Sequence, residues 1–206
     1  MIIAVSGTPG AGKTAISEEL AALMDANQIS ITELSKKIPH GYDRKRKSRI
    51  IDIKVLQREI NRKIIKGRIN IIDGHLSHLL KSDIVIIIRC NPRVLKMRME
   101  KKGWPAAKIR ENIEAELLDQ ITIEAIRRHR NVFEIDSSRI SASTTAKIAK
   151  KIILNKYNRK KYRPGSIDWT RKYTKTFLQM SSASRKTDSF ARYMVDALCH
   201  SLERHS

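Results

Sequence analysis

The stretch GTPGAGKT at residues 7–14 decides the fold, because it matches the phosphate-binding pattern GxxxxGK(S/T) at every required position. It follows the apolar run IIAV at residues 2–5, typical of a buried parallel strand, and it opens a segment, 13–26, with apolar residues at helical spacing. A glycine-rich loop in this place directs backbone N–H groups and a helix N-terminus at a phosphate. The alternative is an accidental glycine-rich turn. The spacing and placement together predict ATP binding.

Residues within this loop have separate expected roles. Gly10 and Gly12 allow backbone angles and a close approach that a Cβ atom would block. Lys13 is expected to reach the β- and γ-phosphates, and the hydroxyl of Thr14 to bind Mg²⁺. The predicted cofactor is therefore Mg²⁺, with ATP as substrate.

The rest of the chain predicts an α/β fold with a parallel sheet covered by helices on both faces, because strand-type runs alternate with helical patterns. Strands are predicted at 29–32, 68–73, 82–89 and 132–135, and helices at 52–66, at 92–101, from about 109 through 128, and at 141–157. The charged segment 36–49 has no clean period and predicts a mobile loop or a small helical insert. Beyond residue 158, basic residues, Pro164-Gly165 and the Ser-rich stretch 181–188 indicate a linker, followed by a short amphipathic helix at 189–202.

The net charge of +21, from 42 basic and 21 acidic residues, exceeds what ATP binding requires. It predicts a polyanionic partner, most simply RNA. A basic proteome or a high-salt cytoplasm that tolerates such a surface is the alternative. The two cysteines, Cys90 and Cys199, are far apart, which argues against a disulfide framework or a zinc site. We expect no signal peptide and no membrane span, and hence a cytoplasmic protein.

Two residues, one at the end of the third predicted strand and one just after it, are candidates for a role in catalysis. Asp73 ends that strand and is placed to hold Mg²⁺, directly or through water; the alternative is a turn-forming residue. His75 could orient water or the phosphate acceptor, or could simply satisfy local hydrogen bonds. His78 is expected on the surface.

The loop GTPGAGKT, the triplet Asp73-Gly74-His75, and the stretch RCNP at 89–92 through NIEAE at 112–116 resemble the archaeal "putative adenylate kinases". That family is related to the eukaryotic nuclear adenylate kinase isoenzyme six. The resemblance covers residues 1–173 and leaves 174–206 as a C-terminal extension without a family role. It implies a nucleoside monophosphate (NMP) kinase fold with a five-stranded parallel sheet, an NMP-binding insert at about 30–53 and a short lid at about 101–111.

The resemblance also implies site residues. Gly10, Ala11, Gly12, Lys13, Thr14 and Ala15 would surround the ATP phosphates, and Asp73 and His75 would form the acidic strand-end pair, with His75 linked to hydrolysis. Arg98 matches a family arginine before the lid. Lys102 stands where the family tends to have arginine; it keeps the charge at the catalytic and ATP-binding position but lacks the planar fork. Arg139 falls where the family approaches the adenine.

The cluster RKRK at 44–47 with Arg49 lies in the expected acceptor region. Arg44, Arg46 and Arg49 are candidates for holding the NMP phosphate. The cluster could instead be a solvated basic face or an RNA-facing surface, and the sequence leaves these alternatives open.

The family implies broad-specificity transfer of phosphate from ATP to nucleoside monophosphates, with AMP favoured and some ATPase activity. It also implies a role in late maturation of the small ribosomal subunit and its 16S rRNA, through a platform ribosomal protein of the uS11 family. Two alternatives remain: a ribosome-assembly ATPase with incidental kinase activity, and a small-molecule kinase with a non-nucleotide acceptor.

Overall fold

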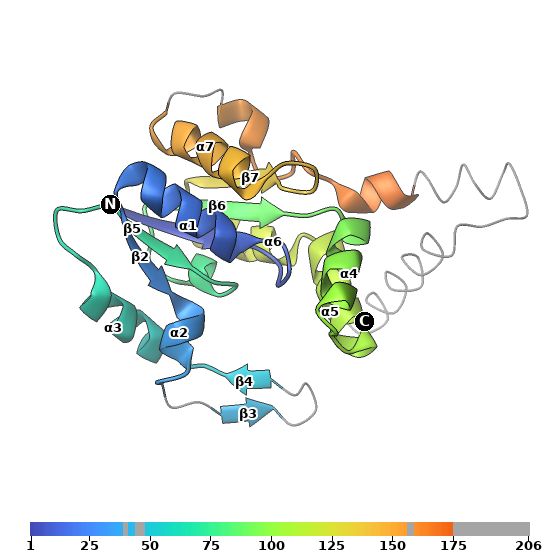
Figure 1. The fold of residues 1–206 in the computed structure, drawn as a ribbon, viewed down its shortest axis with the longest axis horizontal. Helices are drawn as coiled ribbons and strands as arrows, with labels where there is room; N and C mark the ends of the chain where they lie inside the picture. The colour runs from blue at the N-terminus through green and yellow to red at the C-terminus, as the bar shows by residue number, and fades with distance from the viewer. Residues whose placement is uncertain (39–40, 44–47, 156–158, 175–206) are drawn as a thin grey trace, which may run out of the picture.

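A five-stranded parallel sheet forms the centre of the protein (Figure 1). The computed structural model describes residues 1–38, 41–43, 48–155 and 159–174, with only the backbone described at 42–43 and 48–50. In spatial order the strands are β2 (Asn27–Ser30), β5 (Asn70–Asp73), β1 (Ile2–Ser6), β6 (Ile84–Arg89) and β7 (Val132–Asp136). The predicted fold class is confirmed.

Helices cover both faces of the sheet. The helices are α1 (Lys13–Met24), α2 (Ile31–Ser35), α3 (Ile53–Lys63), α4 (Pro92–Lys101), α5 (Ala106–Leu117), α6 (Gln120–Ile126) and α7 (Ala142–Ile153), with the 3₁₀ turns η1 (Ser77–Leu79) and η2 (Arg159–Tyr162). One face packs against α1 and α7, and the core on that side extends to α4 and α5. The opposite face packs against α3 and α6. Figure 1 shows α4 and α5 beyond the carboxyl end of β6, where the phosphate-binding loop also lies.

Burial on both faces explains why the central strands are rich in Ile and Val. All six residues of β6 are buried. In β1, Val5 belongs to the core on the α1 and α7 side, while Ala4 packs on the other side with residues of β6 and α6. Hydrophobic burial therefore fixes the position of β1, and with it the start of the loop that follows.

The prediction of one helix from about 109 through 128 is wrong in one respect, because the chain forms two helices there, α5 and α6. Asp119 lies between them with a left-handed φ of 52°, a conformation that Asp adopts more readily than most residues. The second strand also lies earlier than predicted, at 27–30. The Ser30 hydroxyl accepts a hydrogen bond from the backbone N–H of Glu33, and this cap starts α2 at Ile31.

The segment predicted as a loop or a small helical insert contains an antiparallel hairpin, β3 (Gly41–Asp43) with β4 (Ser48–Ile50). Three-residue strands are too short to show an alternating pattern, which explains the error. Residues 39–40 and 44–47 lie outside the described residues.

The last described segment belongs to the main core. Its aromatic side chains Tyr162, Trp169 and Tyr173 are buried in the cluster on the α1 and α7 side. The prediction of a linker beyond residue 158 is therefore wrong for 159–173, while its Ser-rich part at 181–188 and the predicted helix at 189–202 lie outside the described residues. The last core helix ends at Ile153, earlier than predicted. Within the described part of the chain, no helix is both long and apolar enough to cross a membrane.

Candidate active site at the carboxyl edge of the sheet

The phosphate-binding loop joins β1 to α1 and depends on glycine at its first position. Gly7 has φ of 141°, and a Cβ atom there would lie 2.3 Å from the carbonyl oxygen of Ile88 in the neighbouring strand. The loop turns back on itself through a hydrogen bond from the Ala11 N–H to the Thr8 carbonyl, at 3.0 Å. Gly12, with φ of 99°, is the N-cap of α1. The first-turn amides of α1 therefore face the site, where they can receive an anion.

Lys13 is the cation of this loop, and it is buried although it is the first residue of a helix. Its Nζ donates a hydrogen bond to the Thr8 carbonyl oxygen at 3.1 Å. Burial lowers the pKa of Lys13 to about 8, against the opposing effects of the negative charges of Asp73 and Glu116. A phosphate chain bound at the loop would give this ammonium group a negatively charged partner.

Asp73 ends β5 and pairs in register with Val5 of β1, so it stands beside the start of the loop. The residue is only 1% exposed, and its Oδ1 has no hydrogen-bond partner within the described residues; the same holds for the Oγ of Ser17. Burial raises the pKa of Asp73, although the hydroxyl of Thr14 and the charge of Lys13 oppose the shift. An unpartnered buried carboxylate oxygen of this kind is suited to a bound cation.

A cavity of about 470 Å³ opens beside the loop. It is lined by Gly10, Ala11, Gly12 and Ala15 from the loop and the start of α1, by Arg98, Lys101 and Lys102 from the end of α4, and by Ser137 and Ala142. This volume lies in the range of small-ligand sites. Three cations on one wall and backbone amides on another fit a polyanionic ligand.

Arg98 ties this wall to the loop. Its Nη1 donates to the Ala11 carbonyl oxygen at 3.2 Å and contacts the Cys90 sulfur at 3.5 Å, and its Nη2 donates to the Ser137 carbonyl at 3.4 Å. Lys102 is exposed, lines the cavity, and lies close enough to Lys13 to help lower the pKa of that ammonium group.

His75 follows β5 and is exposed to solvent, and it does not line the 470 Å³ cavity. The protein atoms around the ring remove part of its hydration, and this desolvation, with the positive charge of Lys13, lowers the pKa of His75. The imidazole is therefore neutral at pH 7 and close enough to sense the Lys13 charge.

His78 is buried, which contradicts the prediction of a surface residue. Its Nδ1 lies 2.9 Å from the Ser6 hydroxyl, and its Nε2 lies 2.9 Å from a carboxylate oxygen of Glu124. The turn η1 carries the ring inward, and both ring nitrogens find partners there. Burial lowers the pKa of His78, with the Glu124 carboxylate opposing it.

Other predicted residues lie outside this cluster or beyond the described side chains. Arg139 is exposed and does not line the cavity, although it follows Ser137 closely in the chain. Arg44 and Arg46 lie outside the described residues, and Arg49 is described only as backbone within β4. The acceptor roles of these three arginines stay predictions.

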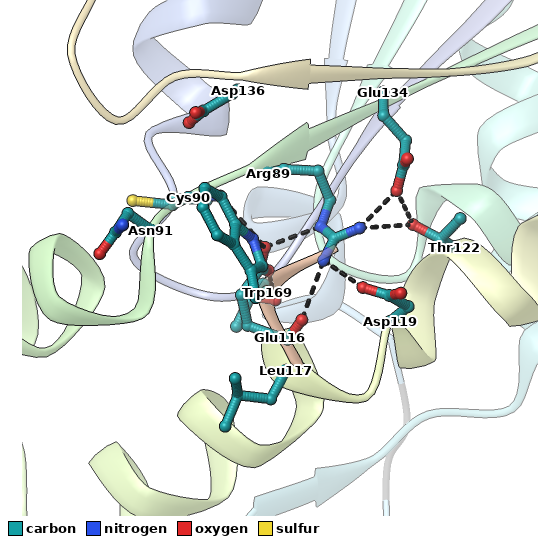
Figure 2. Close-up of polar contacts among 12 residues, drawn as sticks. Arg89, Cys90, Asn91, Glu116, Leu117, Asp119, Thr122, Glu134, Asp136 and Trp169 are labelled. Atoms are coloured by element: carbon teal, nitrogen blue, oxygen red, sulfur yellow. Dashed lines mark hydrogen bonds and ion pairs between the residues drawn. The ribbon is translucent and has the colours of Figure 1, made fainter. Parts of the chain in front are cut away.

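A buried network around Arg89 connects the loop to the end of the described chain, and the sequence reasoning missed its role (Figure 2). Arg89, at the end of β6, forms ion pairs with Glu116, Asp119 and Glu134. Glu116 also accepts a hydrogen bond from the Thr8 hydroxyl of the loop. The signal was available, because a lone arginine ends the apolar run IVIII at 84–88. Such a charge at a buried strand end requires acidic partners.

Comparison with known proteins agrees with this geometry. A family model described as "AAA domain" matches residues 3–119. The chain is 39% identical over 172 residues to a "Putative adenylate kinase" of Archaeoglobus fulgidus, covering 82% of this chain and 92% of that protein. It is 40% identical over 175 residues to another of that name from Methanocaldococcus jannaschii, covering 84% and 95%.

Solved structures share the fold at low identity. Shikimate kinase from Acinetobacter baumannii matches with a TM-score of 0.53 and 14% identity, covering 75% of this chain and 93% of that one. Deoxyadenosine kinase from M. mycoides matches with a TM-score of 0.51 and 16% identity, covering 76% and 100%. These structures show the fold alone. By contrast, the chain matches its two sequence relatives over nearly the whole of their length. The chain therefore belongs to the family of archaeal putative adenylate kinases.

Proposed function

We propose that the protein is a nucleoside monophosphate kinase that transfers the γ-phosphate of Mg-ATP to a nucleoside monophosphate, with AMP favoured. The observation that carries the proposal is that Lys13, a buried cation, and Asp73, whose buried Oδ1 has no hydrogen-bond partner within the described residues, both lie at the loop. The name that the sequence relatives carry points to the same activity. A cavity with three cations on one wall supports the proposal, because the ATP phosphates and nucleoside would fit there.

The residues present fit Mg²⁺. Magnesium in nucleotide sites takes one or two protein oxygens and completes its coordination with phosphate and water. Asp73 would supply the carboxylate, directly or through water, and Thr14 the hydroxyl; within the described residues the buried Oδ1 of Asp73 has no hydrogen-bond partner. No group of three or more acidic, histidine or cysteine ligands is found among residues 1–38, 41–43, 48–155 and 159–174. A metal bound jointly with ATP suits this sparse donor set; when bound, it neutralises phosphate charge.

The chain's own cations would stabilise charge as the phosphoryl group moves. Lys13 would leave the Thr8 carbonyl for the phosphates, with Lys102 and Arg98 beside it. Because Lys102 is a lysine, it offers a point charge instead of a two-pronged donor. His75, neutral at pH 7, would accept a hydrogen bond from water, and water in that place would account for ATPase activity.

The acceptor would bind over the segment 30–53, with Arg44, Arg46 and Arg49 holding its phosphate. Phosphate recognition by arginine is compatible with several bases, which supports broad specificity. The segment 101–111, which runs from the last residue of α4 through the connection at 102–105 into the first half of α5, would act as the lid. Gly103 there has a left-handed φ of 69°, which ends α4.

A coupled assay of ADP formation tests the kinase. The protein is incubated with Mg-ATP alone and then with AMP, CMP, GMP or UMP. We expect strong stimulation, greatest with AMP. Rates that none of the four monophosphates changes would refute the acceptor assignment, and a non-nucleotide acceptor would then be sought.

The net charge of +21 favours a second role, in maturation of the small ribosomal subunit and its 16S rRNA in the cytoplasm. In this reading the protein is an ATPase that binds a platform ribosomal protein of the uS11 family and nearby RNA. Hydrolysis that changes on adding the platform protein, without a nucleotide acceptor, supports it. Binding to ribosomal RNA that persists undiminished at high salt would contradict an electrostatic basis.

A further inference from the structure

We propose that Glu116 and Trp169 are positioning residues for the phosphate-binding loop, so that the segment 159–173 forms part of the nucleotide site. This inference rests on the proposed nucleotide binding, but not on the identity of the acceptor. It concerns a contact chain from Trp169 through Glu116 and Thr8 to Lys13.

The Glu116 carboxylate is the centre of this chain (Figure 2). Its Oε1 accepts hydrogen bonds from Arg89 Nε at 2.7 Å, from the Cys90 N–H at 3.1 Å and from Trp169 Nε1 at 3.1 Å. Its Oε2 accepts from the Thr8 hydroxyl. Four donors from different parts of the chain thus fix one carboxylate, which is itself only 2% exposed. A carboxylate held on all sides is a rigid acceptor for the loop residue.

Thr8 transmits that position to Lys13. Its hydroxyl is bound to Glu116, while its carbonyl oxygen accepts from Lys13 Nζ and from the Ala11 N–H. Glu116 therefore fixes, through the Thr8 hydroxyl, the residue whose carbonyl oxygen contacts the Lys13 ammonium group.

The segment 159–173 is anchored on both sides of this carboxylate. The Gly165 N–H donates to Glu134 at 2.9 Å, the Thr170 hydroxyl donates to the Leu117 carbonyl at 2.7 Å, and the Tyr173 hydroxyl donates to Asn91 Oδ1 at 2.6 Å. Among the contacts described for this segment, the indole N–H of Trp169 is the donor that reaches the carboxylate bound to the loop. A displacement of the segment would therefore shift the Glu116 carboxylate, and with it the Thr8 side chain that is bound to it.

The test compares Trp169→Phe with Thr170→Val. Both variants remove one hydrogen bond from the same segment, but only the first touches Glu116. The dissociation constant for Mg-ATP is measured by calorimetry, with thermal unfolding as the measure of folding. We expect Trp169→Phe to raise the dissociation constant about three- to tenfold, because a hydrogen bond to a charged group is lost, and Thr170→Val to leave it unchanged. Equal dissociation constants in the two variants would overturn the proposal.

Glu116→Gln gives an independent readout. The amide keeps the size of the side chain but removes the negative charge that four donors contact, so the dissociation constant for Mg-ATP should rise at least as much as in Trp169→Phe. A dissociation constant equal to that of the wild type would contradict the positioning role of Glu116. Wild-type protein that binds no Mg-ATP would refute the proposed function and this inference together. An effect of Trp169→Phe without any monophosphate-stimulated turnover would support the inference and refute the acceptor assignment alone.

Discussion

The ammonium group of Lys13 donates a hydrogen bond to the carbonyl oxygen of Thr8, five residues earlier in the same loop. The side chain that is expected to bind phosphate thus contacts its own loop and is buried from water. Burial of the side chain, whose effect on the pKa the contact itself would oppose, explains why Lys13, with a pKa of about 8, is a weaker base than an exposed lysine.

The pH dependence of nucleotide binding should follow this lysine. Phosphate favours the ammonium form, so affinity for Mg-ATP should be constant well below pH 8 and should fall as pH rises above it. Calorimetry at pH 8 in two buffers of different ionisation enthalpy should show uptake of about half a proton per nucleotide, since Lys13 is half protonated in the free protein. Lys13→Ala should lose turnover and this proton uptake. Uptake that persists in the variant would assign it to another group.

Asp73→Asn should separate stability from activity. The folded-state pKa of Asp73 is raised by burial, so the ionised form costs folding free energy at pH above that pKa, and the cost disappears when the carboxyl is protonated. The amide removes this cost, and the free energy of unfolding at pH 7 should rise. Turnover should fall by about 100-fold or more, because the metal loses its carboxylate.

The control for Asp73→Asn is Asp25→Asn. The Asp25 side chain is 95% exposed and pairs with Arg68 on the surface. We expect unchanged turnover and a change in unfolding free energy within about 0.5 kcal/mol. An Asp73→Asn variant that keeps wild-type turnover would remove Asp73 from the metal site.

His75→Ala should damage turnover and preserve binding. The ring is exposed and the lowered pKa keeps it neutral at pH 7, so its loss changes neither the core nor the charge that holds ATP. We expect the rate of ATP hydrolysis to fall by about 100-fold, with a dissociation constant for Mg-ATP within about twofold of wild type. The wild-type rate should show no inflection near pH 6.5 from this histidine. Hydrolysis at the wild-type rate in the variant would show that His75 has no part in it.

Local patterns in the sequence predicted the parts of the site that depend on neighbours in the chain. The loop at residues 7–14 and Asp73 at the end of a buried strand are of this kind. The features that the sequence did not predict depend on partners far away in the chain. The His78 ring is buried because its Nε2 pairs with the carboxylate of Glu124, 46 residues later. The break between α5 and α6 brings the Asp119 carboxylate to Arg89. The spacing of apolar residues in the sequence does not predict this ion pair.

Arg89→Met should test how far the buried network supports the fold. The guanidinium, 2% exposed, pairs with Glu116, Asp119 and Glu134, and its removal leaves three carboxylates without their cation. We expect a loss of about 3–5 kcal/mol in the free energy of unfolding at pH 7. Without Arg89 the pKa of Asp119, which burial already raises, rises further, because the guanidinium charge opposes that shift in the wild type. The variant should therefore regain part of its stability as the pH is lowered and Asp119 takes up a proton.

Arg62→Met is the matched control for Arg89→Met, because Arg62 is 73% exposed and pairs with Glu59 on the surface of α3. Its unfolding free energy should change by less than about 1 kcal/mol, with no recovery at lower pH. Urea titrations of both variants and the wild type at several pH values measure these quantities. If Arg89→Met were no less stable than Arg62→Met, the three carboxylates would have to be compensated by groups other than Arg89. The positioning of Thr8 through Glu116 would then not depend on the Arg89 ion pairs.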